Sequence, residues 1–501
     1  MILRKLLRGI DYQNTSGPID VDISAVAYDS TQVTDGGLFV AIKGENTDGH
    51  RFVVPALRSG AGAVVIEEPV ETLPKELRDN TTVIRVADTK TALAKISSNF
   101  YGDPTSLLTL VGVTGTNGKT TVTYLLDSIW KEEGRNPGLL GTIETRFGDR
   151  SLPSPLTTPE ATDLMKTFSE MIAGDTDCAV MEVSSHSLSR KRVDGCSFDA
   201  CVFTNLSQDH LDYHGSMENY FKEKKRLFTE LLPSSGKGDK YSIINTDDRF
   251  GERLAAESKG TMLSYSLSGS GADVFCLNTE ADSTGITSTI ATPWGKAVIK
   301  SELYGSHNML NILAAATCAL ALGASLKSVE AGVNKVKKIH GRLERIETGR
   351  GFDVLIDYAH TPDALLNALK AVKPLTKGSV VLVFGCGGDR DPLKRPLMGR
   401  IGRELSDVLI ITSDNPRTED PQAIIDQIKS GFKGAGNNEK PCYIISDRRD
   451  AITRAIELSK QGDTVLIAGK GHENYQILGT TRLPLDDREV AGTALEQLKN
   501  K

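Results

Sequence analysis

The sequence predicts an α/β protein with parallel sheets, divided into three domains over residues 1–106, 107–337 and 338–501. Its 501 residues are too many for a single hydrophobic core. A strand, a glycine-rich loop and a helix follow one another over residues 108–126, which is the pattern of a phosphate-binding βα unit. Strands and helices then alternate through the last third of the chain, which indicates βαβ units and a Rossmann-like sheet.

The composition is that of a soluble globular protein, with 39% hydrophobic and 25% charged residues. No apolar run is long enough to span a bilayer, and the opening segment MILRKLLRGI is too short for a signal peptide. The seven cysteines show no metal-type spacing and fit a reducing compartment. The net charge of −6 argues against nucleic acid, so an anionic substrate would need local clusters of Arg and Lys. We therefore expect a cytoplasmic protein with no membrane insertion and no nucleic-acid partner.

Residues 1–106 mix short strands with short helices. A strand is expected within Gly36–Gly44, a helix followed by a glycine turn and a strand within Asn46–Glu68, and a second helix over Thr89–Tyr101. Taken alone, Ala27–Val33 is best interpreted as a polar loop. These patterns indicate a small α/β domain and specify no chemistry.

The chain is organised around residues 108–126. Leu108–Val113 is a short apolar run typical of a buried parallel strand, and apolar residues at helical spacing follow Thr120. Between them, Gly115 and Gly118 let the backbone approach phosphate groups, and the helix N-terminus favours an anion. An ordinary glycine-rich turn is the alternative, but the flanking pattern and the GKTT sequence argue against it.

The residues after the glycines supply the groups that nucleotide binding needs. Lys119 is a point charge for the outer phosphates, and the hydroxyl of Thr120 or Thr121 can hold Mg²⁺. The general pattern has Gly at position 113, where this chain has Val113, so the loop TGTNGKT is a variant of that class.

Two further strands end in polar residues downstream of this loop. Glu182 ends the apolar run that starts at Cys178, and His210 follows the next strand within NLSQDHLDYHG. Ligands of doubly wound sheets gather at the carboxyl ends of the strands. A single Glu or His in such a place is normally structural, but two at equivalent places beside a phosphate loop favour metal and substrate binding.

The helix expected over Glu218–Leu232 carries a lysine on its apolar face. Lys224 lies four residues from both Tyr220 and Phe228. A charged amine in that place should be paired, neutral or modified, or else its long side chain should extend to the surface, and the periodicity does not decide between these alternatives. The other basic residues of this helix are expected on a solvated face: Lys222, Lys225 and Arg226.

The rest of the chain leads into the βαβ series. A β-rich stretch over residues 262–303 precedes a buried Ala- and Leu-rich helix within Tyr304–Gly323, and residues 340–347 are expected to form a hinge. Four strands of the last segment are followed by polar loops, which should meet at one edge of the sheet and form a site. The loop GCGGDRD lacks the GxGxxG spacing of a dinucleotide fingerprint. The four loops are residues 357–365, 385–396, 413–421 and 469–473.

Eleven short motifs occur in order along the chain: TGTNGKTT, TTPE, MEVSSH, NLSQDHLDYHG, YxxxKxxLF, GxHNxxN, HGRxE, DYAHTPD, GGDRDPxKRP, SDNPR and GKGHE. Together they resemble the Mur ligase family, and DSxxVxxGxLFVAIxG, DGHxF and GAxAVV in the first segment are similar to its UDP-binding domain. The resemblance covers essentially the whole chain. It implies a UDP-substrate-binding domain over 1–106, a P-loop-type ATP-binding ligase domain over 107–337 and an amino-acid-binding domain over 338–501.

The resemblance implies a role for each matching residue. Those implied to bind ATP are Gly115, Thr116, Asn117, Gly118, Lys119, Thr120, Thr121, Asn308, Arg342 and Asp357. Those implied to bind Mg²⁺ are Thr120, Glu182, His210 and Lys224, the last as N6-carboxylysine, a carbamate. The implied catalytic residues are Lys119, Lys224, Glu182 and His210. Those implied to hold the UDP-muramoyl dipeptide are Ser30, Thr157, Thr158, Ser184, Arg190 and Arg192. Those implied to bind the incoming amino acid are Arg390, Asp414, Asn415, Pro416, Arg417, Gly469 and Glu473.

The implied activity is that of an ATP- and Mg²⁺-dependent ligase of peptidoglycan precursor synthesis. An acyl phosphate forms on the D-Glu γ-carboxylate of UDP-N-acetylmuramoyl-L-Ala-D-Glu, and an amine of meso-diaminopimelate then displaces phosphate. The DNPR sequence at residues 414–417 resembles the version that selects meso-diaminopimelate, whose distal carboxylate can pair bidentately with Arg417. We expect the protein to act as a monomer.

Three alternatives remain. An L-lysine-adding version of the same ligase would differ in SDNPR, and a folylpolyglutamate synthase-like ligase would lack both SDNPR and the first domain. A non-catalytic nucleotide-binding regulator would have lost a residue of the core chemistry, and none is lost here. The chain departs from the family pattern at three positions outside that chemistry: Thr31, where Arg is usual, Arg190, where Gln is commoner, and Glu223, where Ala is commoner.

Overall fold

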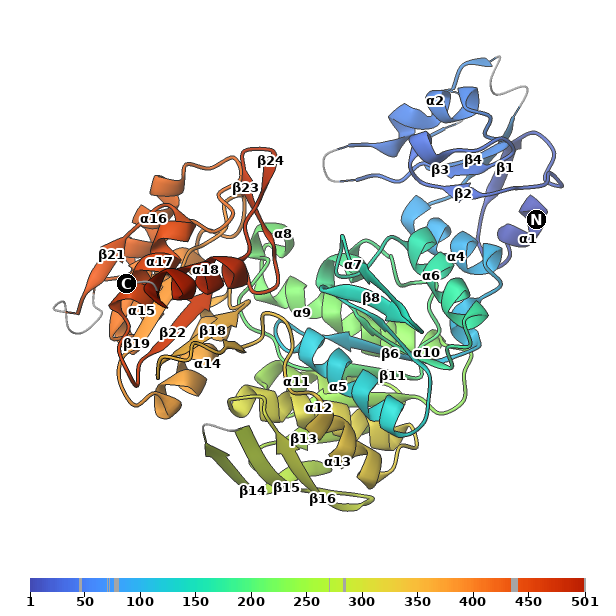
Figure 1. Cartoon of the computed structure of the whole chain (residues 1–501). Helices are drawn as coiled ribbons and strands as arrows, with labels where there is room; N and C mark the ends of the chain where they lie inside the picture. Colours follow the sequence, from blue (N-terminus) through green and yellow to red (C-terminus); the bar gives the residue numbers. More distant parts are fainter. Residues whose placement is uncertain are drawn as a thin grey trace.

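The structure is a computed structural model that describes residues 1–44, 47–69, 71, 73–75, 81–269, 271–282, 285–433 and 440–499. An N-terminal lobe (blue) and a C-terminal lobe (orange and red) both adjoin a central lobe, and each outer lobe holds one chain terminus (Figure 1). The strands of the three lobes fall within residues 1–106, 107–337 and 338–501. The predicted α/β class with three domains is confirmed, whereas the boundaries between them stay predictions.

The N-terminal lobe is a five-stranded sheet in the order β1-β5-β4-β3-β2, in which only β1 is antiparallel to its neighbour. Helices cover both faces, so every residue of β4 is buried. The strand expected within Gly36–Gly44 is confined to β3, and the first residue of the segment expected over Asn46–Glu68 lies outside the described residues. The elements are α1 (Leu3–Leu6), β1 (Gln13–Ser16), β2 (Val26–Ala27), η1 (Ser30–Gln32), β3 (Leu38–Val40), η2 (Gly49–Phe52), α2 (Val53–Arg58), β4 (Ala63–Ile66), β5 (Thr82–Arg85) and α4 (Thr89–Phe100).

The central lobe is built on an eleven-stranded sheet in the order β16-β15-β14-β13-β12-β11-β6-β10-β7-β8-β9. The phosphate-loop strand β6 lies between β10 and β11 and is parallel to both, while antiparallel strands extend the sheet at its two ends. α5, α12 and α13 cover one face, and α6, α9 and α11 cover the other. The strands are β6 (Thr109–Thr114), β7 (Pro137–Leu140), β8 (Glu144–Phe147), β9 (Arg150–Pro153), β10 (Cys178–Glu182), β11 (Ala200–Phe203), β12 (Tyr241–Asn245), β13 (Thr261–Ser266), β14 (Val274–Asp282), β15 (Gly285–Thr292) and β16 (Gly295–Ser301). The helices are η4 (Pro104–Ser106), α5 (Lys119–Glu132), α6 (Ala161–Ala173), α7 (Ser185–Ser189), α8 (Leu211–His214), α9 (Met217–Arg226), η5 (Leu227–Leu231), α10 (Leu232–Ser234), α11 (Arg249–Glu257), α12 (Ser306–Ala321) and α13 (Leu326–Lys335).

The helix expected over Glu218–Leu232 differs from the prediction in two respects. After α9, the segment η5 is a π-helical turn, which leads into α10. The expectation that Arg226 faces solvent is wrong, because α7 packs against this side of α9 and leaves only 9% of the Arg226 side chain exposed. The buried guanidinium is satisfied by Leu188 O (2.6 Å) and by ion pairs with Asp194 and Glu230, both 2.9 Å.

The C-terminal lobe is a six-stranded sheet in the order β17-β18-β22-β19-β20-β21, parallel except for β17. Because β18, β22, β19 and β20 are parallel neighbours, the four polar loops leave the same edge of the sheet. A hairpin of β23 and β24 follows the last of these loops. The elements are β17 (Glu344–Ile346), β18 (Asp353–Asp357), α14 (Pro362–Val372), η6 (Lys373–Leu375), β19 (Val380–Phe384), α15 (Lys394–Leu405), β20 (Val408–Ile411), α16 (Pro421–Ser430), β21 (Cys442–Ile444), α17 (Arg448–Leu458), β22 (Thr464–Ala468), β23 (Tyr475–Leu478), β24 (Thr481–Pro484) and α18 (Asp487–Lys499).

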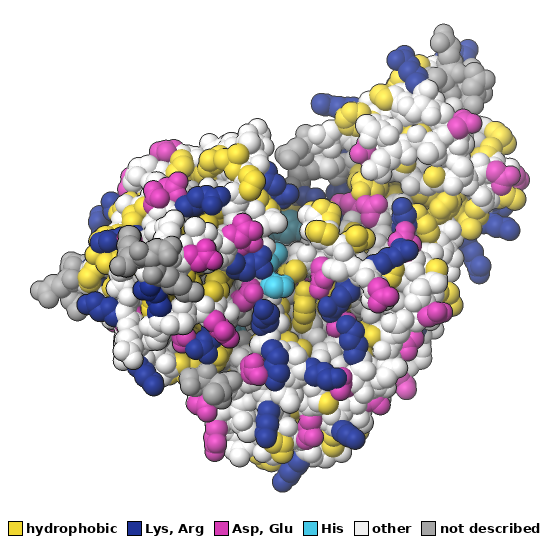
Figure 2. Space-filling view, in the orientation of Figure 1, with side chains coloured by type: hydrophobic (Ala, Val, Ile, Leu, Met, Phe, Trp, Pro, Cys, Tyr) yellow, Lys and Arg dark blue, Asp and Glu magenta, His cyan; other side chains and the backbone are white. Residues whose placement is uncertain are grey.

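The central lobe contacts both outer lobes. α4 packs against α6, where the Ser97 and Thr162 hydroxyls lie 2.9 Å apart and Tyr28 donates to Asp163 (2.7 Å). On the other side, the central and C-terminal lobes meet across a groove in which histidine side chains are visible (Figure 2). Over its described residues the chain has no helix with the length and apolar character that crossing a bilayer requires.

Candidate active site

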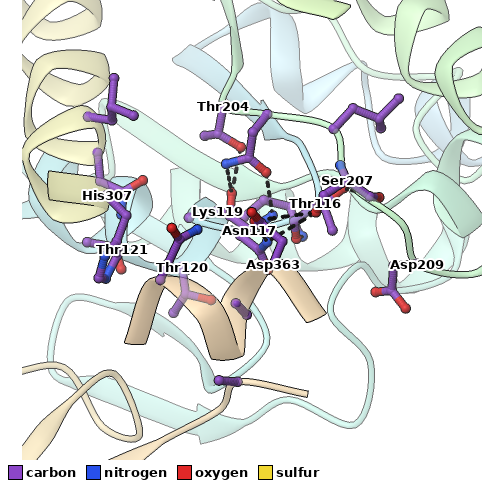
Figure 3. A pocket seen from close by; sticks show the side chains of 18 of the residues that line it. Thr116, Asn117, Lys119, Thr120, Thr121, Thr204, Ser207, Asp209, His307 and Asp363 are labelled. Atoms are coloured by element: carbon purple, nitrogen blue, oxygen red, sulfur yellow. Dashed lines mark hydrogen bonds between the residues drawn. The ribbon is translucent and has the colours of Figure 1, made fainter. Parts of the chain in front are cut away.

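The phosphate loop connects β6 to α5 through two glycines in unusual conformations. Gly115 and Gly118 have φ angles of +146° and +89°, which residues with a side chain rarely adopt. A Cβ on Gly115 would collide with the Thr204 hydroxyl oxygen, and one on Gly118 with the Asn311 amide. Thr204 Oγ1 also donates a hydrogen bond to Asn117 O (2.6 Å), and both residues are labelled in Figure 3. Contacts with the rest of the protein therefore shape this loop.

The loop opens into a cavity of about 700 Å³ between the central and C-terminal lobes. Figure 3 shows Lys119 and Thr120 from the phosphate loop, His307 from α12 and Asp363 from α14 around the same space. This volume lies in the usual range for a small-molecule site. The predicted site residues that line the cavity are Thr116, Asn117, Gly118, Lys119, Thr120, Thr121, Thr157, Glu182, Ser184, His210, Asn308, Arg342 and Asp357.

Lys119 turns back onto its own loop. Its Nζ donates to Gly115 O (3.0 Å) and Thr116 O (2.8 Å), so backbone carbonyls are its hydrogen-bond acceptors within the described chain. Burial lowers the pKa of Lys119 against the opposing effects of Glu182 and Asp209. An ammonium group held by neutral carbonyls gains a stronger partner when an anion such as phosphate enters.

Glu182 is held at the end of β10 by two threonines. Its side chain is buried, and Oε1 accepts hydrogen bonds from Thr120 Oγ1 and from Thr142 N, both at 2.9 Å. Oε2 accepts from Thr142 Oγ1 (3.0 Å). The carboxylate is therefore fixed directly beside the hydroxyl that follows Lys119.

The chemistry of these donors fits Mg²⁺. This ion prefers oxygen ligands, and its sites commonly combine one or two carboxylates with substrate phosphates and water. The Glu182 carboxylate and the Thr120 hydroxyl lie next to each other beside the phosphate loop. In the described part of the chain, no three His, Cys, Asp or Glu side chains gather closely enough to form a metal centre by themselves. A metal ion here would therefore need ligands from the substrates as well.

His210 lies in the groove between the central and C-terminal lobes. Its φ is +53°, and its Nε2 stands 3.3 Å from Asp209 Oδ2. Burial lowers the pKa of His210 to about 3 despite Asp209, so the imidazole is neutral at physiological pH, which is the form that binds metal ions. The C-terminal lobe reaches the same carboxylate through His360 and Lys394, each 3.8 Å from an Asp209 oxygen.

Lys224 is fully enclosed, so the alternative in which its side chain extends to the surface is wrong. It is 1% exposed, and its Nζ lies 4.7 Å from the centre of the Tyr220 ring. The Nζ donates to Gly115 O (2.9 Å) and contacts Thr114 Oγ1 (3.4 Å). Burial, and then the charge of Lys119, lower the pKa of Lys224 well below that of an ordinary lysine, which favours the neutral, nucleophilic amine.

The C-terminal lobe completes the phosphate loop from the other side. Arg342 Nη2 donates to Thr120 Oγ1 (2.9 Å), and Asn117 Nδ2 donates to Asp363 Oδ2 (2.9 Å) at the start of α14. Asp357, the last residue of β18, lies beside these contacts. Burial raises the pKa of Asp357, although the positive charge of Arg342 acts to lower it. Residues from two lobes thus contact the same loop.

The residues predicted for the UDP-linked substrate fall into separate groups. Thr157 and Ser184 line the large cavity. Thr158 lies beneath them, with its Oγ1 donating to Glu182 O (2.8 Å) and its carbonyl accepting from Arg192 Nη1 (3.0 Å). Thr158 and Arg192 therefore also have structural contacts that connect them to the strand carrying Glu182.

A second cavity, of about 110 Å³, lies between the N-terminal and central lobes. Arg190 and Arg192 line it together with Lys43 and Lys90 from the N-terminal lobe. Glu160 also lines the cavity and forms an ion pair with Arg192, so the lining carries an excess of positive charge that could bind an anion such as a diphosphate. Ser30 begins η1 and lines neither cavity.

The residues predicted for the amino acid gather at the edge of the C-terminal sheet, and none of them lines either cavity. Asn415 Nδ2 donates to Glu473 Oε2 (2.8 Å). A Cβ on Gly387 would lie 3.0 Å from Arg417 Nη1 and 3.8 Å from Arg390 Cγ, so both arginines pack over this glycine. The full cluster is Arg390, Asp414, Asn415, Pro416, Arg417, Gly469 and Glu473.

Several residues at the site were not predicted from the sequence, among them Asp209, His360, Asp363, Lys394 and Thr142. Asp363 and Lys394 belong to DYAHTPD and GGDRDPxKRP, so the motifs already pointed to their loops. Thr142 belongs to no motif. It reaches Glu182 because β7, which precedes it, pairs with β10.

Comparison with known proteins matches three family models in succession. They are the Mur ligase family catalytic domain over residues 22–101, the Mur ligase middle domain over 113–319, and the Mur ligase glutamate ligase domain over 341–471. A UDP-N-acetylmuramoyl-L-alanyl-D-glutamate–2,6-diaminopimelate ligase of Geobacter metallireducens is 43% identical and covers 100% of this chain and 99% of its own. A solved structure of a ligase with that name covers 100% of both chains at 30% identity, with a TM-score of 0.70. A Mycobacterium tuberculosis folylpolyglutamate synthase covers 82% of this chain and 95% of its own at 18% identity, with a TM-score of 0.63, which shows a shared fold alone.

Proposed function

The chain belongs to the Mur ligase family, and we propose that it is an ATP-dependent ligase of peptidoglycan precursor synthesis. It joins meso-diaminopimelate to the D-Glu γ-carboxylate of UDP-N-acetylmuramoyl-L-Ala-D-Glu. The observation that carries this proposal is the full-length similarity to ligases of that name, 43% identity over the whole chain in one case. The site supports it, since a phosphate loop, a buried carboxylate and a pair of arginines suit a nucleotide and an amino acid.

The reaction has two steps. A γ-carboxylate oxygen of D-Glu attacks the γ-phosphorus of ATP, the bond to the ADP oxygen breaks, and an acyl phosphate forms. An amine of meso-diaminopimelate then attacks the acyl carbon, loses a proton and expels inorganic phosphate, which leaves an amide. The protein contributes mainly positioning and charge stabilisation, and Lys119 and Arg342, which both contact the phosphate loop, would supply the positive charges for the phosphates.

Mg²⁺ is the proposed cofactor. Thr120, Glu182 and His210 would bind Mg²⁺, and a carboxylated Lys224 would supply a carboxylate to a second Mg²⁺. When bound, Mg²⁺ neutralises charge on the nucleotide phosphates and so favours attack by an anionic carboxylate. The backbone N–H and the hydroxyl of Thr142 each donate a hydrogen bond to the Glu182 carboxylate, and these two bonds would keep it oriented toward the ion.

Lys224 is proposed to carry a carbamate. Its neutral amine adds to the carbon of CO₂, a proton leaves the nitrogen, and a carboxylate then ends the side chain. Burial and the lowered pKa support this, because the neutral amine is the form that adds to CO₂. The carbamate would then place a carboxylate ligand near the positive charge of Lys119.

The other substrates approach from the two outer lobes. The UDP-linked dipeptide would extend from Thr157 toward the basic cavity at Arg190 and Arg192. Arg417 Nη1 donates to Gly388 O (2.7 Å), so the edge formed by Nε and Nη2 can pair bidentately with the distal carboxylate of meso-diaminopimelate. L-Lysine lacks that carboxylate. We propose that the protein works as a monomer in the cytoplasm.

The test is phosphate release from ATP with Mg²⁺ and UDP-N-acetylmuramoyl-L-Ala-D-Glu, with meso-diaminopimelate and L-lysine in parallel. We expect turnover with meso-diaminopimelate only, lost on chelation of Mg²⁺ and restored when Mg²⁺ is added back. Turnover with lysine would overturn the amino-acid assignment and keep the ligase chemistry. Turnover only with a folate and glutamate would favour a folylpolyglutamate synthase-type enzyme, and nucleotide binding without any turnover would favour a regulator.

A further inference from the structure

Two loops of the C-terminal lobe carry the arginines of the amino-acid cluster. The β19 loop (residues 385–393) and the β20 loop (residues 412–420) leave the sheet side by side because β19 and β20 are parallel neighbours. Gly388 N donates to Asn415 O (2.9 Å), and Thr418 Oγ1 donates to Asp389 Oδ1 (2.7 Å), so hydrogen bonds join the two loops. Asp389 and Arg417 have φ angles of +51° and +52°, conformations that persist only where surrounding contacts hold them.

An ion pair between a buried arginine and a partly exposed glutamate connects these loops to the helix behind them. Arg395, on α15, has a fully buried side chain, and its Nη1 and Nη2 donate to the two carboxylate oxygens of Glu419 at 2.7 and 2.8 Å. Nη2 also donates to Gly387 O (3.0 Å), in the β19 loop. Glu419 Oε1 accepts a further hydrogen bond from Asp389 N (2.6 Å). Glu419, in the β20 loop, is therefore connected to the backbone of the β19 loop both directly and through Arg395.

The connected backbone is the part that carries Arg390 and Arg417. Both side chains pack over Gly387, whose carbonyl Arg395 holds. Arg417 Nη1 donates to Gly388 O (2.7 Å), and Arg390 Nη1 donates to Asp389 O (2.8 Å). Burial and the charge of Arg390 lower the pKa of Arg417, as expected for two guanidinium groups held close together. A carboxylate that enters beside them relieves this repulsion, provided that the spacing of the two groups is kept.

We propose that Arg395 and Glu419 are positioning residues for the amino-acid substrate. Their ion pair fixes the spacing of Arg390 and Arg417, and that spacing sets the affinity for a carboxylate of the incoming amino acid. Neither residue touches the substrate. The inference rests on the proposed function, because it takes the amino acid to bind over these two arginines.

The experiment compares Glu419→Gln and Arg395→Lys with the wild type in full steady-state kinetics. Glu419→Gln keeps the shape of the side chain and removes its charge, while Arg395→Lys keeps the charge and loses the planar fork. We expect the KM for meso-diaminopimelate to rise by about tenfold or more in Glu419→Gln, as for a lost charge-assisted contact. The KM values for ATP and the UDP-linked dipeptide should change by less than about twofold, Arg395→Lys should be intermediate, and the preference for meso-diaminopimelate over L-lysine should fall.

The control is Glu404→Gln, which removes another Arg–Glu pair of α15, the exposed contact of 2.8 Å between Arg400 and Glu404. It should leave all three KM values unchanged. A pair with only a structural role would lower the folded fraction and kcat and leave every KM unchanged, and that result would overturn the inference. Equal rises in all three KM values would do so too. A wild type without activity toward meso-diaminopimelate would instead overturn the proposed function and this inference with it.

Discussion

Replacing Lys224 by alanine should abolish ligase activity without unfolding the protein. The substitution removes three buried methylenes, a loss of about 2–3 kcal/mol at roughly 0.8 kcal/mol each. It also removes an amine that is 1% exposed and hydrogen-bonded to backbone and hydroxyl oxygens, so little desolvation cost is recovered. A loss of this size is smaller than the stability of a typical domain, about 5–15 kcal/mol, so we expect a lowered melting temperature and a protein that is still folded in the assay. The loss of activity would then report on chemistry.

The truncated side chain should accept a small carboxylic acid of one particular length. In an extended lysine carbamate the carboxyl carbon stands about 6 Å from Cβ, at roughly 1.25 Å per bond. A free acid in the same space must also keep a separation of about 3.8 Å from that Cβ. About 2.5 Å remains for the acid's own chain, which is roughly two carbon–carbon bonds. Propionate should therefore restore activity better than formate or pentanoate.

The assay is phosphate release in Lys224→Ala with each acid, beside the wild type and Lys222→Ala, an exposed lysine of the same helix. We expect a loss of about a thousandfold or more in Lys224→Ala, partial recovery with propionate and full activity in Lys222→Ala. ¹³C-bicarbonate should also give a carbamate signal in the NMR spectrum of the wild type and none in Lys224→Ala. Full activity of Lys224→Ala would refute the reasoning, and recovery that is independent of acid length would show that the acids act elsewhere.

Three further predictions concern the amino-acid and metal sites. Arg417→Ala should raise the KM for meso-diaminopimelate by about tenfold or more and leave the KM for ATP within about twofold; steady-state kinetics with an unchanged KM for the amino acid would count against the carboxylate contact. Thr142→Val keeps the side-chain shape but loses the 3.0 Å hydrogen bond to Glu182. Turnover should fall roughly tenfold and the half-saturating Mg²⁺ concentration should rise, whereas an unchanged Mg²⁺ titration would separate Thr142 from the metal. The hydrogen bond from Arg395 lowers the pKa of Glu419 below its usual 4.5. A carboxyl group whose pKa is lowered in the folded state stabilises the fold above its usual pKa of 4.5, and this stabilisation is lost as the pH falls through the folded-state pKa. The difference in unfolding free energy between the wild type and Glu419→Gln should therefore shrink below pH 4.5. Urea unfolding at several pH values measures this, and a difference that is independent of pH would contradict it.

The sequence predicts well those parts of the fold and site that depend on residues close to one another along the chain. The strand, loop and helix around Lys119 follow one another directly, so their apolar periodicity and glycines are visible in one stretch. The position of Lys224 on an apolar face follows from the spacing of its own helix. Arg226 shows the limit, because the same spacing could not reveal that α7 covers the other side of that helix.

Contacts between distant segments could not be predicted in this way. Thr142 reaches Glu182 only because β7 pairs with β10, and no periodicity gives the order of strands in a sheet. The pairing of Arg395 with Glu419 depends likewise on α15 packing against α16 behind two neighbouring loops. The sequence motifs predict which loops form the site. The residues that hold those loops in place can be identified only from the tertiary structure.

The strand order of the central sheet has a consequence for how the protein is made. A chain leaving the ribosome can complete the N-terminal sheet early, because β1 to β5 all lie before residue 86. β6 emerges next, but its neighbours β10 and β11 come only at residues 178–203, and α12, whose Asn311 packs against Gly118, ends at Ala321. We expect the nascent phosphate loop to stay unformed while about two hundred further residues are synthesised, with its apolar strand available to chaperones. The phosphate loop is thus encoded early in the message and assembled late in translation.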